Sequence, residues 1–250
     1  MIFLKRFRAP KPTFSAALAP DRPFFAIGDI HGREDLLIRL LEKMAERAPD
    51  LPLIFVGDYI DRGEQSAQVL ARLMELQRQA PERVTCLAGN HEDMLLKFLK
   101  DPASNGPRWM RYGGLQTMSS CRLSAPRESA EAAAWEEARD QLAAALPAGC
   151  AAWLEDLPIG WDSGNVAVIH AGLDPLVPPG IQSRQTLLWG HPDFATTPRE
   201  DGIWVVHGHT ITSTPLQRAG RISIDTGAYA TGRLTAALIQ PGAEVEFLQT

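Results

Sequence analysis

Five short clusters rich in Asp, Asn, His and Gly each follow an apolar run with the length of a buried strand. The apolar runs span residues 24–27, 53–56, 84–88, 166–169 and 203–206. The clusters read GDIHG from residue 28, GDYIDRG from 57, GNHE from 89, HAG from 170 and HGHT from 207. Open α/β sheets place their sites at the carboxyl ends of strands. The chain is therefore constrained to a sheet-based fold whose strand ends carry a polar site.

Helical patterns follow the first three clusters. Apolar residues recur at helical spacing over residues 36–44, 69–76 and 94–99, with charged residues between them. Pro81 closes the second of these helices, and the third stops before Pro102. Strand and helix signals thus alternate, which predicts an α/β fold with helices packed against a sheet.

The middle of the chain has a different composition. Residues 101–160 are rich in Ala, Glu and Arg, and we interpret them as a helical insertion that forms a cap over the site and supplies no metal ligand. Short strands return at residues 166–169, 203–206, 221–224 and 234–239, which predicts a second sheet. Without an internal repeat or a long linker, we expect an arm over residues 1–20 and a single domain over residues 21–250, with the cap at about 101–160.

Composition excludes several classes of function. The formal net charge is -5, whereas general nucleic-acid binding requires a basic face, so we expect no nucleic-acid partner. Three cysteines without a CxxC spacing favour a reducing, cytoplasmic location. No apolar run approaches the roughly 20 residues of a membrane-spanning helix, so we expect no stable membrane association. The basic arm leaves open a weak contact with a membrane surface or a partner.

The first two clusters carry the residue types of a metal site. Asp29 and His31 lie two residues apart at a strand end, so both side chains can reach one point and hold a first metal ion. Asp58 follows the next strand, and its two carboxylate oxygens can bridge the first ion and a second one.

The remaining clusters complete the second metal site. Asn90 offers an amide oxygen, and His170 and His209 add imidazoles, with His207 as a competing ligand on the residues alone. Imidazole, carboxylate and amide oxygen together suit Mn, Fe or Zn better than calcium. Two such ions about 3.5–4 Å apart can trap a water, lower its pKa and clamp a phosphoryl oxygen. The pattern therefore predicts a two-metal hydrolase.

The same five motifs resemble the phosphoprotein phosphatase branch of the calcineurin-like metallophosphoesterases. The resemblance covers about residues 24–232, is weaker over 101–160, and is most specific in GDYIDRG. It is strongest toward compact bacterial enzymes, which include serine/threonine protein phosphatases and symmetrical diadenosine tetraphosphate hydrolases. It implies an αββα sandwich of two mixed sheets with a helical cap insertion and a dimetal site at one edge.

The resemblance also implies roles for individual residues. Asp29, His31 and Asp58 would hold one ion, and the other would be held by Asp58, Asn90, His170 and His209. Because His209 is the implied ligand, His207 would be a neighbour of the metal site and not a ligand. His91 would protonate the leaving oxygen, oriented by Asp61, and Arg62 would hold phosphate oxygens through its planar guanidinium.

One position departs from the family pattern. Bacterial relatives commonly carry an Arg two residues after the Trp of a segment like 187–189, and this chain has His191 there, followed by Pro192. The expected substrate-binding residues are therefore Arg62, Asn90, His191 and Arg111, with Arg184 and Arg199 as further candidates for the missing cation.

These observations predict a phosphomonoester hydrolase that uses two Mn(II) ions, with Fe or Zn as alternatives. The expected substrate is a phosphoprotein or a phosphorylated small molecule, with serine/threonine protein phosphatase activity favoured. A hydroxide held by both metals would attack phosphorus directly, and the chain has no CxxxxxR motif of a cysteine phosphatase. One alternative is a symmetrical dinucleoside tetraphosphate hydrolase, for which Trp109, Arg111 and Tyr112 are candidates to stack on adenine. The other is a catalytically weak regulatory protein that binds metal and phosphopeptide.

Overall fold

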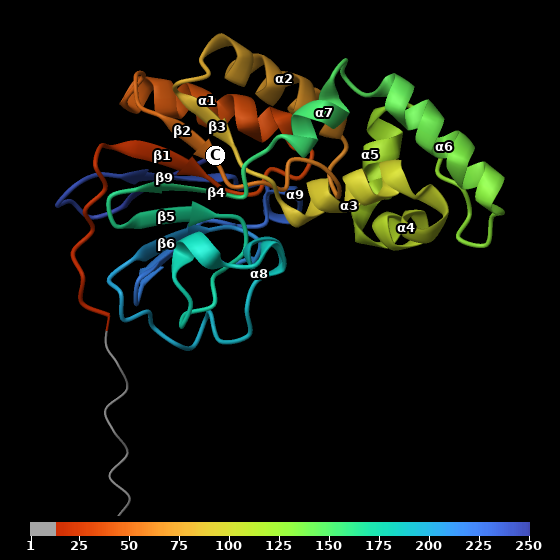
Figure 1. The fold of residues 1–250 in the computed structure, drawn as a ribbon. Helices are drawn as coiled ribbons and strands as arrows, with labels where there is room; N and C mark the ends of the chain where they lie inside the picture. The colour runs from red at the N-terminus through yellow and green to blue at the C-terminus, as the bar shows by residue number, and fades with distance from the viewer. Residues whose placement is uncertain (1–13) are drawn as a thin grey trace, which may run out of the picture.

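Two five-stranded mixed sheets pack face to face in the computed structural model, which describes residues 14–250 (Figure 1). The first sheet has the order β10-β9-β1-β2-β3, and the second has the order β4-β5-β6-β8-β7. The first sheet consists of β1 (Phe24–Ile27), β2 (Leu53–Phe55), β3 (Val84–Cys86), β9 (Thr235–Ile239) and β10 (Glu246–Gln249). The second consists of β4 (Gly160–Ser163), β5 (Val166–Ile169), β6 (Trp204–His207), β7 (Leu216–Arg218) and β8 (Arg221–Ser223).

The side chains of β1 show how one strand serves two layers of the core. Successive side chains of a strand point to opposite faces of the sheet. Phe24 and Ala26 pack into the apolar layer between the two sheets. Phe25 and Ile27 point the other way, into the core beneath the helices. This alternation explains why an uninterrupted apolar run, rather than an alternating one, marks this strand.

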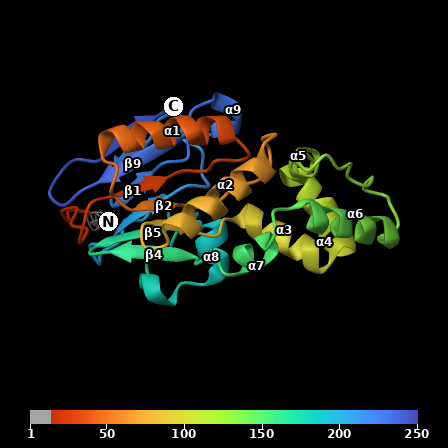
Figure 2. The ribbon, with the colours of Figure 1, turned by 90° about the horizontal axis from the view of Figure 1, so that it is seen from above.

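Long helices cover the outer face of the first sheet, as Figures 1 and 2 show. Helix α1 (Glu34–Arg47) connects β1 to β2, and α2 (Ser66–Gln79) connects β2 to β3. Because both connections are helical crossovers, the three strands run parallel. Their carboxyl ends therefore meet at one edge of the sheet, and α3 (Asn90–Lys100) starts from that edge. The predicted order of strands and helices over this part of the chain is confirmed.

The outer face of the second sheet has a much thinner cover. Ile169 and Val205 pack there against Leu173, Leu187 and Phe194, which lie in a loop-rich segment. This segment contains the 3-10 turn η2 (Pro179–Ile181) and the short helix α8 (Arg184–Trp189). Its many prolines prevent a longer helix. The αββα arrangement is thus present, with a fourth layer that is mostly loop.

The segment between β3 and β4 is helical, as predicted. It contains α4 (Pro102–Trp109), the π-helical turn η1 (Met110–Gly114), α5 (Leu115–Ser120), α6 (Ala132–Ala145) and α7 (Cys150–Glu155). In both ribbon views α4, α5 and α6 lie beyond the end of the sheets rather than over either face (Figures 1 and 2). This end is also where the parallel strands of the first sheet finish, so the insertion borders the predicted site.

Three strands lay outside the prediction, and all of them are edge strands. Strand β10 lies at an edge of the first sheet, and β4 and β7 lie at the two edges of the second. These three strands bury less side-chain surface than β3, the edge strand that the apolar run over residues 84–88 did predict, so their sequences lack such a run. The four residues of β10 are all only partly buried.

The N-terminal arm was predicted over residues 1–20, and residues 1–13 lie outside the described part of the chain. The segment from residue 14 to the start of β1 packs on the second sheet. Phe14 lies edge-on to Trp204, with 4.9 Å between the ring centroids, and Leu18 is buried between the sheets. Among residues 14–250, no helix combines the length and the apolar character needed to cross a membrane.

Candidate metal centre

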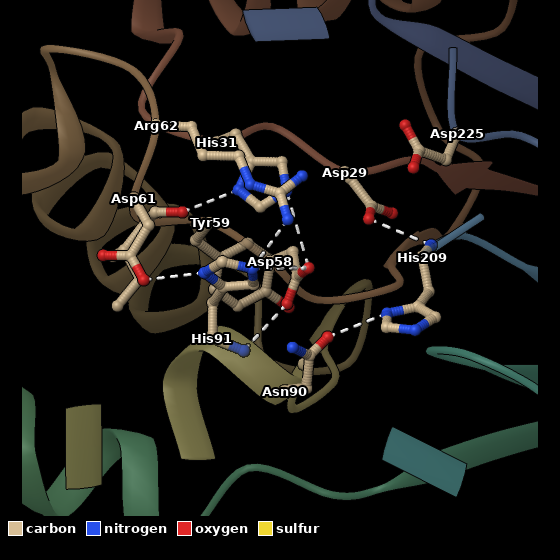
Figure 3. Close-up of polar contacts among 12 residues, drawn as sticks. Asp29, His31, Asp58, Tyr59, Asp61, Arg62, Asn90, His91, His209 and Asp225 are labelled. Atoms are coloured by element: carbon tan, nitrogen blue, oxygen red, sulfur yellow. Dashed lines mark hydrogen bonds and ion pairs between the residues drawn. The ribbon is translucent and has the colours of Figure 1, made fainter. Parts of the chain in front are cut away.

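The strand ends bring the six predicted ligands together. Figure 3 labels five of them, and the sixth, His170, lies beside Asn90 and Asp58. They come from the loop after β1, the ends of β2 and β5, the first residue of α3 and the turn after β6. Five of the six side chains are buried, and the last one in the chain is half-buried. The six predicted ligands are Asp29, His31, Asp58, Asn90, His170 and His209.

Asp58 lies between two histidines on different sheets. Its Oδ2 is 3.5 Å from Nε2 of His31, and its Oδ1 is 3.4 Å from Nε2 of His170. The two oxygens of one carboxylate therefore face different imidazoles. Asp58 belongs to two groups of side chains whose N and O atoms lie within 4.8 Å of one another, one with His31 and His91 and one with His170 and His209. These two groups are consistent with a dimetal site.

Asn90 and two histidines converge on the second of these groups. The Oδ1 atom of Asn90 is 2.8 Å from Nε2 of His170 and 2.9 Å from Nδ1 of His209. His207 points elsewhere, because its Nε2 is 2.9 Å from the hydroxyl of Ser223. The structure therefore separates the two histidines of HGHT, and only His209 joins the group.

The backbone selects the nitrogen that each buried histidine presents to the centre. Nδ1–H of His31 donates to the carbonyl of Ile60 at 2.8 Å, and Nδ1–H of His170 donates to that of Val56 at 3.1 Å. In both rings the unprotonated Nε2 then points toward Asp58. Such carbonyl contacts fix the orientation of metal-binding histidines.

Asp29 shows most directly that the centre fits cations. Its Oδ1 is buried without a hydrogen-bond partner in the described structure, while Oδ2 accepts from the backbone N–H of His209 at 2.9 Å. Burial, followed by the charges of Asp225 and Asp58, raises the pKa of Asp29 well above its ordinary value. A buried carboxylate needs a paired charge, and a divalent ion on Oδ1 would supply it.

The histidine ligands are poised in their neutral form. Burial is the main cause that lowers the pKa of His31 to about 3 and that of His209 to about 4. Burial alone would raise the pKa of Asp58, but its closeness to His170, His91 and His31 lowers it, so Asp58 stays ionised. Neutral imidazoles around an ionised carboxylate are the protonation states that metal binding requires.

His91 stands beside the metal ligands with a carboxylate partner. Its Nδ1 is 2.6 Å from Oδ2 of Asp61, and its Nε2 lies 3.3 Å from a guanidinium nitrogen of Arg62 and 3.8 Å from Asp58. Burial alone would lower the pKa of His91, but Asp58 and Asp61 outweigh it and raise the pKa. The ring is thus favoured in its protonated form, which a proton donor requires.

Asp61 is fully buried and is held by the helical insertion. The indole N–H of Trp109 donates to its Oδ2 at 2.9 Å, and the hydroxyl of Thr117 donates to its Oδ1 at 2.6 Å. Its own backbone N–H donates to the hydroxyls of Ser66 and Thr117. Sequence reasoning missed these partners, because nothing in the spacing of Trp109 and Thr117 links them to GDYIDRG.

Glu92 supports the backbone of the centre, a role that sequence reasoning did not assign. Its carboxylate accepts from the backbone N–H groups of Asp58 at 2.9 Å, Tyr59 at 2.8 Å and Gly89 at 2.9 Å. Burial, then the charge of Asp58, raises its pKa to about 7. Its place three residues after the helix N-cap Gly89 is a capping-box position and was the available signal.

Left-handed backbone conformations are concentrated in this centre. Five non-glycine residues there have positive φ angles: His31 at 46°, Asp58 at 54°, Asp61 at 70°, Arg62 at 66° and His209 at 62°. Such angles cost roughly 1–2 kcal/mol per L-residue, so surrounding contacts must impose them. One such contact is the hydrogen bond from the backbone N–H of Asp58 to Glu92, which holds the backbone at Asp58.

Arg62 and Tyr229 lie next to each other beside His31. The guanidinium of Arg62 lies over the ring of Tyr229, 5.0 Å from its centroid, and this ring lies edge-on to His31 at 5.4 Å. Tyr229 was not predicted, because it follows a turn with no metal-binding residue type beside it.

Two predicted substrate-binding residues contact other partners. Nε2 of His191 is 3.6 Å from a carboxylate oxygen of Asp174, and the backbone N–H of Asp193 donates to its Nδ1 at 3.3 Å. Arg111 pairs with Glu128 at 2.6 Å, and both are exposed. Neither contact involves a residue of the metal centre.

The alternative cations differ in their surroundings. Arg184 lies 3.5 Å from Asp93 in the first turn of α3 and is half exposed. Arg199 is buried, where it pairs with Asp201 and donates to the carbonyls of Asp174 and Val177. Arg199 therefore has a structural role in the loop layer.

Comparison with known proteins places this geometry in a family context. The family profile described as Calcineurin-like phosphoesterase matches residues 22–226. Over 85 residues the chain is 35% identical to Serine/threonine-protein phosphatase rdgC of Drosophila melanogaster, a match that covers 32% of this chain and 13% of that protein. The chain thus spans a small part of this curated relative.

Two solved structures share the fold over most of the chain. A putative diadenosine tetraphosphatase superposes with a TM-score of 0.63 at 21% identity, covering 94% of this chain and 98% of that one. A protein serine/threonine phosphatase from Saccharomyces cerevisiae, with similarity to human phosphatase PP5, gives a TM-score of 0.59 at 18% identity, covering 92% and 80%. At such identities these likenesses show the fold.

Proposed function

The chain belongs to the calcineurin-like phosphoesterase family, and on this premise we propose that it hydrolyses phosphoserine and phosphothreonine esters in proteins. It is a metal-dependent phosphoesterase with two groups of His and Asp side chains for the ions. The observation that carries the proposal is the carboxylate of Asp58, whose two oxygens face histidines from different sheets.

We assign the ligands as two overlapping sets. Asp29, His31 and Asp58 hold one ion, and the second ion is held by Asp58, Asn90, His170 and His209. The mixture of imidazole, carboxylate and amide oxygen favours Mn(II), with Fe or Zn as alternatives. When bound, two such ions supply an activated water and withdraw charge from the phosphoryl group.

The neighbouring residues supply the rest of the reaction. Arg62 binds phosphate oxygens through its guanidinium, which Tyr229 supports from one face. His91 gives a proton to the leaving oxygen, because Nδ1 is held by Asp61 and Nε2 faces Arg62 and Asp58. An alkoxide is a poor leaving group, so this proton lowers the barrier.

Symmetrical hydrolysis of dinucleoside tetraphosphates is the second candidate. The structural likeness to a putative diadenosine tetraphosphatase over nearly the full length of both chains supports it. Arginine and aromatic groups at the border of the insertion add support, because Arg108 lies over the rings of both Tyr112 and Trp189, at 5.8 and 5.2 Å. Such groups can stack on a base.

A substrate panel separates the two candidates. The Mn(II)-loaded protein would be tested on a generic aryl phosphate, on phosphoserine and phosphothreonine peptides, and on diadenosine tetraphosphate. We expect turnover of the aryl phosphate and higher kcat/KM for phosphopeptides. Preference for the dinucleotide would support the second candidate instead, and no hydrolysis of any substrate would contradict both.

The metal assignment is tested by Asp58→Asn. Replacing the shared carboxylate by a neutral amide should abolish turnover and loosen both ions, because the bridge loses its charge. The measurement is metal content after dialysis, with turnover measured in parallel. Asp140→Asn is the matched control, since that carboxylate is exposed in the insertion. Two ions retained at full affinity by Asp58→Asn would contradict the assignment.

A further inference from the structure

A cavity lies on the outer face of the second sheet and borders the turn that carries His209. Its volume is about 480 Å³, within the range of small-molecule sites. It lies over β6, β7 and β8 and is closed on one side by the loop around Phe194. No predicted or proposed role involves this cavity.

The charge of the cavity differs from that of the chain. Two arginines, Arg218 and Arg221, line it, and its lining contains no Asp or Glu, although the chain as a whole has a net charge of -5. Within residues 14–250, no hydrogen bond or ion pair involves the guanidinium of Arg218. Burial, then the charge of Arg218, lowers the pKa of Arg221. The two cations thus repel each other, and a bound anion would relieve that repulsion.

One nitrogen of the Arg221 guanidinium fixes the side chain by hydrogen bonds, and the other two nitrogens are available for a ligand. Its Nη1 donates to the carbonyl of Phe194 at 2.9 Å and to that of Thr197 at 3.4 Å. Across the described residues, Nε and Nη2 have no hydrogen-bond partner. A fixed guanidinium with two unused nitrogens can bind phosphate oxygens bidentately.

The rest of the lining suits an organic group rather than a bare ion. The ring of Phe194 lies edge-on to His207 at 4.9 Å and forms one wall. Leu216 forms another apolar wall. Its side chain is 45% exposed, so an apolar group of a ligand can pack against it. The hydroxyl of Thr210 adds a polar group beside them.

The cavity and the metal centre share a wall. Thr210 lines the cavity and directly follows the proposed ligand His209. Thr212 also lines it, and both its backbone N–H and its hydroxyl donate to the carbonyl of Asp225. Figure 3 shows His209 and Asp225 on the same side of the centre as Asp29. A ligand in the cavity therefore touches the segment that positions the second metal group.

We propose that this cavity binds an organic phosphate of nucleotide size, with the phosphate on Arg218 and Arg221 and the organic body against Phe194 and Leu216. The ligand can be the far end of a large substrate or a separate nucleotide, since both present the same chemistry. The proposal goes beyond the proposed function, because binding there does not require hydrolysis.

Calorimetric titration with α,β-methylene-ADP, whose P–C–P bridge resists hydrolysis, tests the proposal on the Mn(II)-loaded protein. Arg218→Ala should weaken binding by at least about tenfold, the effect of one lost charge-assisted hydrogen bond. Arg39→Ala, an exposed arginine on α1, is the matched control and should bind like wild type. Arg221→Lys keeps the positive charge at this position but loses the bidentate guanidinium, and it should also weaken binding.

Kinetics with Arg218→Ala distinguish the two sources of the phosphate. A raised KM for diadenosine tetraphosphate, with unchanged kinetics on an aryl phosphate, would identify the far end of a substrate. Unchanged kinetics on both, with weakened binding of α,β-methylene-ADP, would identify a separate nucleotide. Binding that is equal in wild type, Arg218→Ala and Arg221→Lys, or absent in all three, would overturn the proposal whether or not the protein is a phosphatase.

Discussion

His91 uses its two ring nitrogens for different tasks. Nδ1 is fixed on a fully buried carboxylate, while Nε2 faces the place where phosphate oxygens and Arg62 would meet. His207 is also buried, but its ring nitrogens face the carbonyl of Gly208 and the hydroxyl of Ser223, and neither contact involves a carboxylate or a guanidinium. The carboxylate and the guanidinium beside the ring of His91 support a chemical role for it.

His91→Asn should keep both metal ions and slow the hydrolysis of alkyl phosphates by on the order of 10²–10⁴-fold, the usual contribution of general acid–base catalysis. Aryl phosphates should lose less, because their leaving oxygen needs little protonation. Steady-state kcat on both substrate types gives the ratio. His207→Asn is the control for removing a buried imidazole, and equal losses on both substrates would refute proton donation by His91.

Single residues were predictable where their type revealed their chemistry. The six proposed ligands could be found because Asp, Asn and His after strand ends are typical of metal sites, and the structure brings all six together. Glu92 and Tyr229 could not be found in this way. Their roles depend on which backbone or ring lies beside them in space, and that proximity is created by the fold.

At the scale of elements, the helical insertion does more than border the centre. Trp109 at the end of α4 and Thr117 in α5 each donate a hydrogen bond to Asp61, one to each carboxylate oxygen. The backbone N–H of Arg62 also donates to the carbonyl of Gly113 in the turn between these helices. The insertion therefore positions Asp61 and Arg62, the two residues of GDYIDRG that are proposed to act in the reaction.

Trp109→Phe should lower kcat by about tenfold, because a hydrogen bond to a charged group contributes about 1.5–3 kcal/mol and part of this positions His91. In the His91→Asn background the same substitution should have little further effect, since both act through one proton transfer. Trp153→Phe removes a comparable indole hydrogen bond, to Gln77, and serves as control. Additive losses in the double variant would show that Trp109 acts independently of His91.

Elements were predictable according to how much of them is buried. Central strands such as β1 and β5 are buried on both faces and are visible as apolar runs. The edge strands β4, β7 and β10 are not visible as apolar runs. They form through backbone hydrogen bonds to a neighbouring strand, and their side chains are not buried on both faces. The position of the insertion relative to the sheets depends on tertiary contacts and was not readable from its composition.

At the scale of the whole molecule, the proposed ions connect the two sheets. Asp29, His31 and Asp58 follow strands of the first sheet, while His170 and His209 follow strands of the second. On the proposed assignment the second ion takes Asp58 and Asn90 from the first sheet and His170 and His209 from the second, so it binds only when both sheets are packed together. Metal binding should therefore stabilise the folded chain as a unit.

Removing the ions should lower the thermal midpoint by roughly 10–20 °C, given about 2.7 kcal/mol of stabilisation per ion at a hundredfold excess over Kd and about 2–4 °C per kcal/mol for a domain of this size. The measurement is calorimetry with Mn(II) and with chelator. Asp58→Asn should show no such difference. The stabilisation should shrink as pH falls, because the raised pKa of Asp29 lets protons compete with the ion. A midpoint independent of metal would contradict a bridge between the sheets.

The cluster of positive φ angles has a consequence for how such a sequence can change. Glycine would fit these positions without strain, yet it would remove the side chains of His31, Asp58 and His209 that the chemistry needs. In the metal-free protein, selection for stability alone would therefore favour the loss of these side chains, whereas bound ions would oppose that loss. Random libraries screened for thermal resistance in the presence of a chelator should accumulate inactive variants at these positions, so directed evolution of this scaffold has to screen stability and activity together.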